Sequence, residues 1–149
     1  MKKVLVSTFL SVLFLASSIL AAGNDIKKED KGDVEQVITN FVKSVDSRDA
    51  GALSKSVISN ANILTFNQIA NKLDDYTASQ FVDLVKNGQK GGWARTVSVS
   101  SVDVDGNIAS AKVDITDPRL KESGYVTLVK DDGTWKVASE VTTLGLNKQ

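Results

Sequence analysis

Cysteine and histidine are both absent from this 149-residue chain. Without cysteine there can be no disulfide, so packing alone must stabilise the fold, and lipid attachment at an N-terminal cysteine is excluded. Without histidine, the Ser-His-Asp triad, the His-rich zinc sites and the usual neutral-pH base are excluded. No other nucleophile or metal-ligand motif stands out, so the sequence predicts no metal and no cofactor.

An excess of charge of either sign is also missing, because 18 basic residues face 18 acidic ones. The charged run between residues 27 and 33 alternates in sign and is typical of a solvated segment. With no basic patch, we expect no binding of nucleic acid.

The N-terminus has the pattern of a secretory signal. Lys2 and Lys3 precede an uncharged stretch from Val4 to Ala22 that ends in small residues. A retained membrane anchor is the alternative, but the stretch is barely long enough to cross a bilayer. We therefore predict a signal peptide over residues 1–22 and a mature chain that starts between Ala22 and Asn24. The mature protein is expected to be periplasmic or secreted, with no membrane attachment.

The first half of the mature chain predicts helices. Residues 23–32 lack apolar periodicity and are expected to be a flexible lead-in, so the domain should span residues 33–149. Asp33 is the expected cap of a first helix and Asp49 of a second, shorter one. A capping box at Thr77 and Gln80 predicts a third. The apolar stripe of the first helix follows a period of 3.6 residues and consists of Val34, Val37, Ile38, Phe41, Val42 and Val45.

The second half predicts a sheet. One or two short strands are expected between Ile63 and Leu73. After Gly91-Gly92 the apolar period becomes that of strands, and Asp105-Gly106 and Asp132-Gly133 are strong hairpin signals. The fold class is therefore α+β, with N-terminal helices packed on a curved antiparallel sheet.

This order of elements, ending in the segment Gly124 to Val137 (GYVTLVKDDGTWKV), resembles the nuclear transport factor 2-like superfamily over Asp33 to about Leu144. The SnoaL-like and lumazine-binding groups are the most similar, with Arg48-Asp49 and Leu53 at the helix bend. The resemblance implies a cystatin-like cone that often holds a small apolar ligand, and a dimer formed through the sheet. Because binding proteins, isomerases, dehydratases and cyclases share this fold, it does not identify the function. Many relatives have a histidine near Ser56 to Asn60, and this chain does not.

Large aromatic side chains are the candidates for lining such a cone. We expect a pocket between the first helix and the sheet, and Trp135, Val137 and Val141 should share one face of a strand. The alternative for Trp135 is that it is an ordinary core residue of its hairpin. The predicted ligand-binding residues are Phe41, Phe66, Trp93, Tyr125 and Trp135.

Three functions remain open. The first is an exported small-molecule binding or accessory protein without catalysis. The second is an isomerase, dehydratase or cyclase, in which a cavity Asp114 or Tyr125 moves a proton; Asp46 and Asp49 fit better as surface charges and caps. The third is an interaction module.

We also expect a homodimer. Val99, Val102, Val104, Val126 and Leu128 do not follow one alternation, which suggests apolar side chains on both faces of the sheet.

Overall fold

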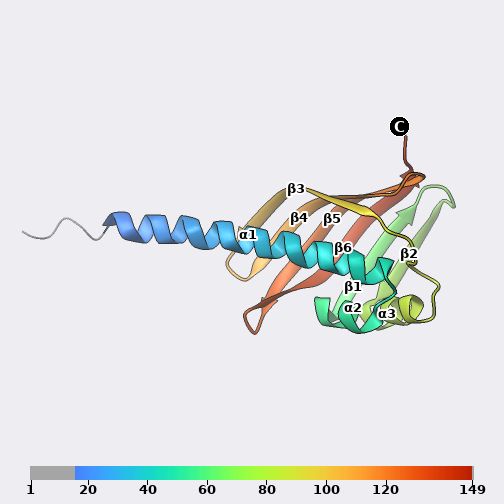
Figure 1. The fold of residues 1–149 in the computed structure, drawn as a ribbon, viewed down its shortest axis with the longest axis horizontal. Helices are drawn as coiled ribbons and strands as arrows, with labels where there is room; N and C mark the ends of the chain where they lie inside the picture. Colours follow the sequence, from blue (N-terminus) through green and yellow to red (C-terminus); the bar gives the residue numbers. More distant parts are fainter. Residues whose placement is uncertain (1–15, 149) are drawn as a thin grey trace, which may run out of the picture.

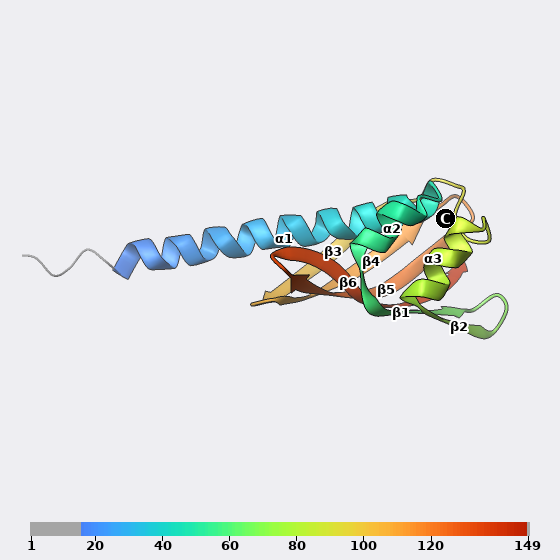
Figure 2. The same cartoon turned by 90° about the horizontal axis from the view of Figure 1, so that it is seen from below.

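Three helices cover one face of a six-stranded sheet in the computed structural model, which describes residues 16–148 (Figures 1 and 2). The helices are α1 (Ala16–Asp46), α2 (Ala50–Ser56) and α3 (Ala78–Lys86). The strands are β1 (Val57–Asn67), β2 (Lys72–Thr77), β3 (Thr96–Asp105), β4 (Ile108–Thr116), β5 (Leu120–Asp131) and β6 (Thr134–Leu146). The predicted α+β class is confirmed.

The sheet has the strand order β2-β1-β6-β5-β4-β3 and is mixed. β1 pairs with β6 in parallel, and every other neighbouring pair is antiparallel. The sheet is thus antiparallel, as predicted, except at this one junction, where the two strands run parallel. Hairpin signals describe only strands that are adjacent in sequence, whereas β1 meets β6 across most of the domain.

The local signals for the turns and short helices are confirmed. Gly106, Asp132 and Gly133 have positive φ angles in the two tight hairpin turns. The side chain of Asp49 accepts a hydrogen bond from the backbone N–H of Ala52 at 2.9 Å and caps α2. Thr77 and Gln80 form the capping box of α3.

The expected start of the first helix is wrong. α1 is helical from Ala16, so Asp33 is not its cap, and residues 23–32 are part of the helix. A tertiary contact accounts for part of the extension: Asp30 accepts hydrogen bonds from Lys130 at 2.6 Å and from the indole Nε1 of Trp135 at 3.2 Å. Most of the predicted signal segment lies outside the described residues. Among residues 16–148, no helix has the length and apolar character required to cross a membrane.

The core lies between α1 and the inner face of the sheet. The predicted stripe of α1 is buried, except that Val37 is only partly covered. Phe41 stacks against Phe81 of α3 with ring centroids 6.2 Å apart. This contact fixes α3 against α1.

A bulge in β3 overturns the sequence argument for the dimer. The pairing of β3 with β4 shifts at Ser100, which adds one residue and reverses the alternation of faces. Val99, Val102 and Val104 therefore all face the core, as do Val126 and Leu128. The outer face instead exposes Ile108, Tyr125 and Val141. The homodimer stays a prediction, which sedimentation of the purified protein would test.

Candidate functional site

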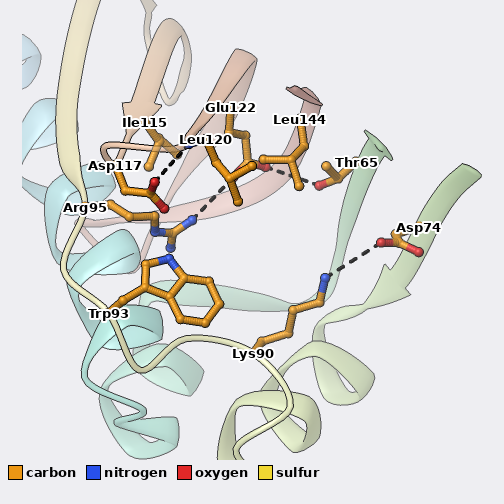
Figure 3. A pocket seen from close by; sticks show the side chains of 10 residues that line it. All are labelled: Thr65, Asp74, Lys90, Trp93, Arg95, Ile115, Asp117, Leu120, Glu122 and Leu144. Atoms are coloured by element: carbon orange, nitrogen blue, oxygen red, sulfur yellow. Dashed lines mark hydrogen bonds and ion pairs between the residues drawn. The ribbon is translucent and has the colours of Figure 1, made fainter. Parts of the chain in front are cut away.

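A pocket of about 100 Å³ lies where the loop between α3 and β3 passes over one end of the sheet (Figure 3). We call it the Trp93 pocket. It is lined by Thr65, Asp74, Lys90, Trp93, Arg95, Ile115, Asp117, Leu120, Glu122 and Leu144. Since ligand pockets usually measure about 300–1,000 Å³, this one fits a small molecule or one end of a larger one.

Two glycines hold the loop that carries Trp93 and Arg95. A Cβ atom on Gly91 would lie 1.8 Å from the backbone oxygen of Val45, so only glycine allows this approach to α1. The N–H of Gly92 donates to the backbone oxygen of Asp46 at 2.9 Å. Arg48 donates from Nη2 to the oxygen of Gly91 at 3.1 Å. The end of α1 thereby positions the pocket's Trp93 and Arg95.

Arg95 links α1 to the sheet inside this pocket. Its backbone N–H and its Nε donate to the two carboxylate oxygens of Asp46, at 2.8 and 2.6 Å. Its Nη1 donates to Glu122 at 3.3 Å. The other oxygen of Glu122 accepts from Thr142 at 2.6 Å and from Thr65 at 3.3 Å. Charge-assisted bonds of this kind hold both partners in fixed orientations.

The two carboxylate oxygens of Asp117 differ in their hydrogen bonding. Oδ1 accepts hydrogen bonds from the backbone N–H groups of Arg119 and Leu120, at 2.7 and 2.9 Å. These two bonds lower the pKa of Asp117, so the side chain is ionised at neutral pH. Oδ2 is buried and has no hydrogen-bond partner in the described part of the chain. Buried acceptors without a partner are rare in proteins.

Glu140 is a second unusual carboxyl group, and it lies on the inner face of β6. Only 4% of the residue is exposed, and the influences on its pKa are burial and neighbouring charges, with no hydrogen bond from a described residue among them. Burial raises the pKa of Glu140 to about 8, and the charge of Glu122 adds to this effect. Arg95 and Lys90 act in the opposite direction. Glu122, Arg95 and Lys90 all line the Trp93 pocket, so Glu140 is electrostatically coupled to it.

Sequence reasoning missed Glu140 because of a bulge at Ala138. Leu128 pairs with Val137 and Thr127 with Ser139, so β6 has one extra residue at this point. Trp135 and Val137 face inward before the bulge, and Glu140 and Thr142 face inward after it. Val141 consequently faces outward. The prediction that Val141 shares a face with Trp135 is therefore wrong. A glutamate between strand residues was the only signal in the sequence, and it is a weak one.

The five predicted ligand-binding residues do not come together. Trp93 alone lines the Trp93 pocket. Phe41 and Trp135 are buried in the core, because they face inward where α1 covers the sheet. Phe66 and Tyr125 are exposed, at 41% and 55%. The predicted space between α1 and the sheet is filled by core side chains, and the Trp93 pocket lies elsewhere, at one end of the sheet.

The two candidate acid-base residues lie on the outer face of the sheet. Asp114 accepts hydrogen bonds from Ser123 at 2.6 Å and from Lys121 at 2.9 Å. The bond from Ser123, followed by that from Lys121, lowers the pKa of Asp114, which makes it a poor proton donor near neutral pH. Tyr125 alternates with inward-facing Val126 and therefore points to solvent. Neither side chain therefore lies in a cavity where it could act as an acid or a base, contrary to the prediction.

No three Asp or Glu side chains within residues 16–148 are grouped closely enough to hold a metal ion. The lining of the Trp93 pocket presents an indole, a hydroxyl group, two cations and three carboxyl groups. Glu140, whose pKa these charges influence, can carry a proton near neutral pH.

Comparison with known families gives one match. The sequence model of a family described as "putative lumazine-binding" matches residues 29–141, which is most of the chain. No curated protein matches the sequence.

Solved structures with the same fold are numerous and distant in sequence. An NTF2-like protein of unknown function from Silicibacter pomeroyi is 16% identical, with a TM-score of 0.68 over 81% of this chain and 98% of its own. An NTF2-like protein with a cystatin-like fold from Novosphingobium aromaticivorans is 16% identical, with a TM-score of 0.61 over 84% and 87%. A ketosteroid isomerase-like protein from Erwinia carotovora is 10% identical, with a TM-score of 0.56 over 79% and 96%. At these identities the similarity concerns the fold alone.

Proposed function

Since this chain belongs to the family described as putative lumazine-binding, within the nuclear transport factor 2-like superfamily, we propose that it binds a small molecule in the Trp93 pocket. One observation carries the proposal: the half-exposed indole of Trp93 shares a pocket with apolar Leu120 and Leu144. The side chains of Arg95 and Glu122 line the same pocket and are held in place by hydrogen bonds. An apolar surface with a few fixed polar groups is the usual composition of a ligand site.

The ligand is expected to co-purify with the native protein. Native mass spectrometry of protein purified from its own compartment should show an added small mass. Titration with this molecule, or with lumazine as a first probe, should change the fluorescence of Trp93. Trp93→Ala should weaken binding roughly tenfold, because it removes the aromatic contact. Tyr125→Ala removes an aromatic side chain from the outer face and is the matched control. Repeated preparations that carry no molecule and do not respond to any probe would contradict the proposal.

The alternative function is an enzyme that transfers protons. Asp114 and Tyr125 do not fit this role. Glu140 is the better candidate, because it is a buried carboxyl group with a pKa of about 8 that the charges of the pocket residues Glu122, Arg95 and Lys90 influence. An enzyme would return its ligand chemically altered, whereas a binding protein returns it unchanged. The mass of the molecule released in the experiment above therefore distinguishes the two.

We further propose that the protein is exported and cleaved near Ala22. The charged and apolar segments of residues 2–22 support this. Asp30 and Val34, which join α1 to the rest of the domain, lie beyond the cleavage point and would be kept. N-terminal sequencing of the native protein should start between Ala22 and Asn24. A sequence that begins at Met1 would contradict export with cleavage.

A further inference from the structure

Four residues with positive φ angles meet beside the Trp93 pocket. Within residues 16–148, the positive-φ residues that lie in hairpin turns, where such angles are expected, are Asn71, Gly106, Asp132 and Gly133. The positive-φ residues outside hairpin turns are Arg48, Gly88, Gly91 and Gly92. A Cβ atom on any of these three glycines would come within 4 Å of the side chain of Arg48, so the four residues lie together.

Arg48 occupies a position that favours glycine. Its N–H donates to the backbone oxygen of Val45 at 3.1 Å, and the N–H of Asp49 donates to that of Ser44 at 2.8 Å. These two bonds form the Schellman motif at the end of a helix, in which the residue after the C-cap is left-handed and usually glycine. Arg48 has this conformation, with a φ of 59°, although its Cβ makes the turn less stable than a glycine would. Strained residues of this kind are often found beside functional sites.

The side chain of Arg48 packs on the loop that carries Trp93. We call residues 88–95 the strap. Nη2 of Arg48 donates to the backbone oxygen of Gly91 at 3.1 Å. A Cβ atom on Gly92 would lie 2.5 Å from the same nitrogen and 2.6 Å from Cζ, so the guanidinium fills the space that a side chain would need. Gly92 directly precedes Trp93, and the guanidinium therefore contacts the strap next to the exposed indole.

The position of the strap depends on the end of α1. The strap contains no helix or strand. Asp46 accepts hydrogen bonds from Gly92 through its backbone oxygen and from Arg95 through its carboxylate. Arg48 adds the contact to Gly91, although it does not itself line the pocket. The pocket residues that the strap supplies are Lys90, Trp93 and Arg95 (Figure 3).

We propose that Arg48 is a positioning residue of the Trp93 pocket, whose guanidinium holds the strap, and with it Trp93, against the end of α1. This inference rests on the proposed function, since it concerns the same pocket. A planar guanidinium can pack against the glycines of the strap while it donates to Gly91, whereas a lysine has only a point charge on a flexible stem. Loss of the guanidinium should loosen the strap and leave the rest of the fold intact.

Arg48→Asn in the full mature protein tests this role, because asparagine tolerates the left-handed conformation and lacks the guanidinium. The urea midpoint of unfolding should stay close to that of the wild type or rise, since relief of strain offsets the lost hydrogen bond. The amides of Gly92 and Arg95 should exchange with solvent at least about tenfold faster. Quenching of fluorescence by acrylamide should increase, because the quencher reaches half-exposed Trp93 and not buried Trp135. Lumazine, as the probe ligand, should bind about tenfold more weakly.

Two further variants separate the guanidinium from charge and from backbone conformation. Arg48→Lys keeps the charge and the strain, so it should loosen the strap as Arg48→Asn does and should also lower the urea midpoint. Asp132→Asn places an asparagine at another left-handed position, in the turn between β5 and β6. It is the matched control and should leave amide exchange in the strap and acrylamide quenching as in the wild type.

The outcomes separate this inference from the proposed function. Wild-type exchange and quenching in Arg48→Asn would overturn the positioning role. Faster exchange in every element, together with a lower urea midpoint, would show that Arg48 only stabilises the fold, and would overturn it as well. A loosened strap with unchanged affinity for lumazine would also contradict it, while leaving the pocket as a binding site. If the wild type does not bind lumazine, exchange and quenching still decide the role of Arg48, and the small mass carried by the native protein decides the proposed function.

Discussion

Replacement of Glu140 by glutamine should stabilise the domain by about 3–5 kcal/mol at pH 9, because a shift of one pKa unit corresponds to about 1.4 kcal/mol. Burial raises the pKa of this carboxyl group from 4.5 to about 8. The folded protein therefore holds a proton that the unfolded chain releases above pH 4.5. The stability associated with the protonated carboxyl is complete below pH 4.5 and is lost as the pH rises to about 8. A glutamine is neutral at every pH, so its contribution to stability does not change as the pH rises.

Urea denaturation of both proteins at pH 5, 7 and 9 measures this difference. The two free energies of unfolding should nearly coincide at pH 5 and separate as the pH rises. Asp30, Asp114 and Asp117 have lowered pKa values, so their contributions are lost only on acidification and are common to both proteins. Glu35→Gln, on the exposed side of α1, is the matched control and should follow the wild type. Parallel curves for wild type and Glu140→Gln would show that Glu140 is not buried as an acid.

The free-energy cost of ionising Glu140 in the folded protein has a functional implication. A buried carboxyl group without a hydrogen-bond partner is unfavourable for stability, and such groups concentrate at binding and catalytic sites. Glu140 also interacts with the charges of Glu122, Arg95 and Lys90 in the pocket wall. A cation bound in the Trp93 pocket would therefore favour the ionised form of Glu140.

Trp135→Ala should reduce the free energy of unfolding by about 3–5 kcal/mol, as expected for the truncation of a large core side chain. The residue is only 3% exposed, and its indole donates to Asp30 of α1. The variant leaves a cavity in the core and also removes this contact between α1 and the β5–β6 hairpin. Trp135 was interpreted either as a pocket-lining residue or as a core residue of its hairpin. The structure supports the core residue.

Urea denaturation again provides the measurement, with Trp93→Ala as the matched control. Trp93 is 46% exposed, so the same truncation should cost only about 1 kcal/mol or less. Ligand binding should respond in the opposite order, with the larger loss in Trp93→Ala. Equal losses of stability in the two variants would contradict the assignment of one tryptophan to the core and the other to the pocket.

The sequence by itself determined the parts of the fold that depend on neighbouring residues. The cap at Asp49, the capping box at Thr77 and Gln80 and the turns at Asp105-Gly106 and Asp132-Gly133 were all predicted and confirmed. Each is a contact among residues a few positions apart, so a short segment contains all the information required. These elements in their order were also enough to indicate the superfamily.

Tertiary structure alone decided which side chains form the site. One extra residue at Ser100 and another at Ala138 reverse the two-residue alternation of their strands. The periodicity of the sequence cannot locate such a bulge, because it arises from the register between two strands. The bulge at Ala138 turns Glu140 inward. The Trp93 pocket is assembled from five strands, the loop between β4 and β5, and the loop that Gly91 holds against α1. No segment of the sequence contains that arrangement.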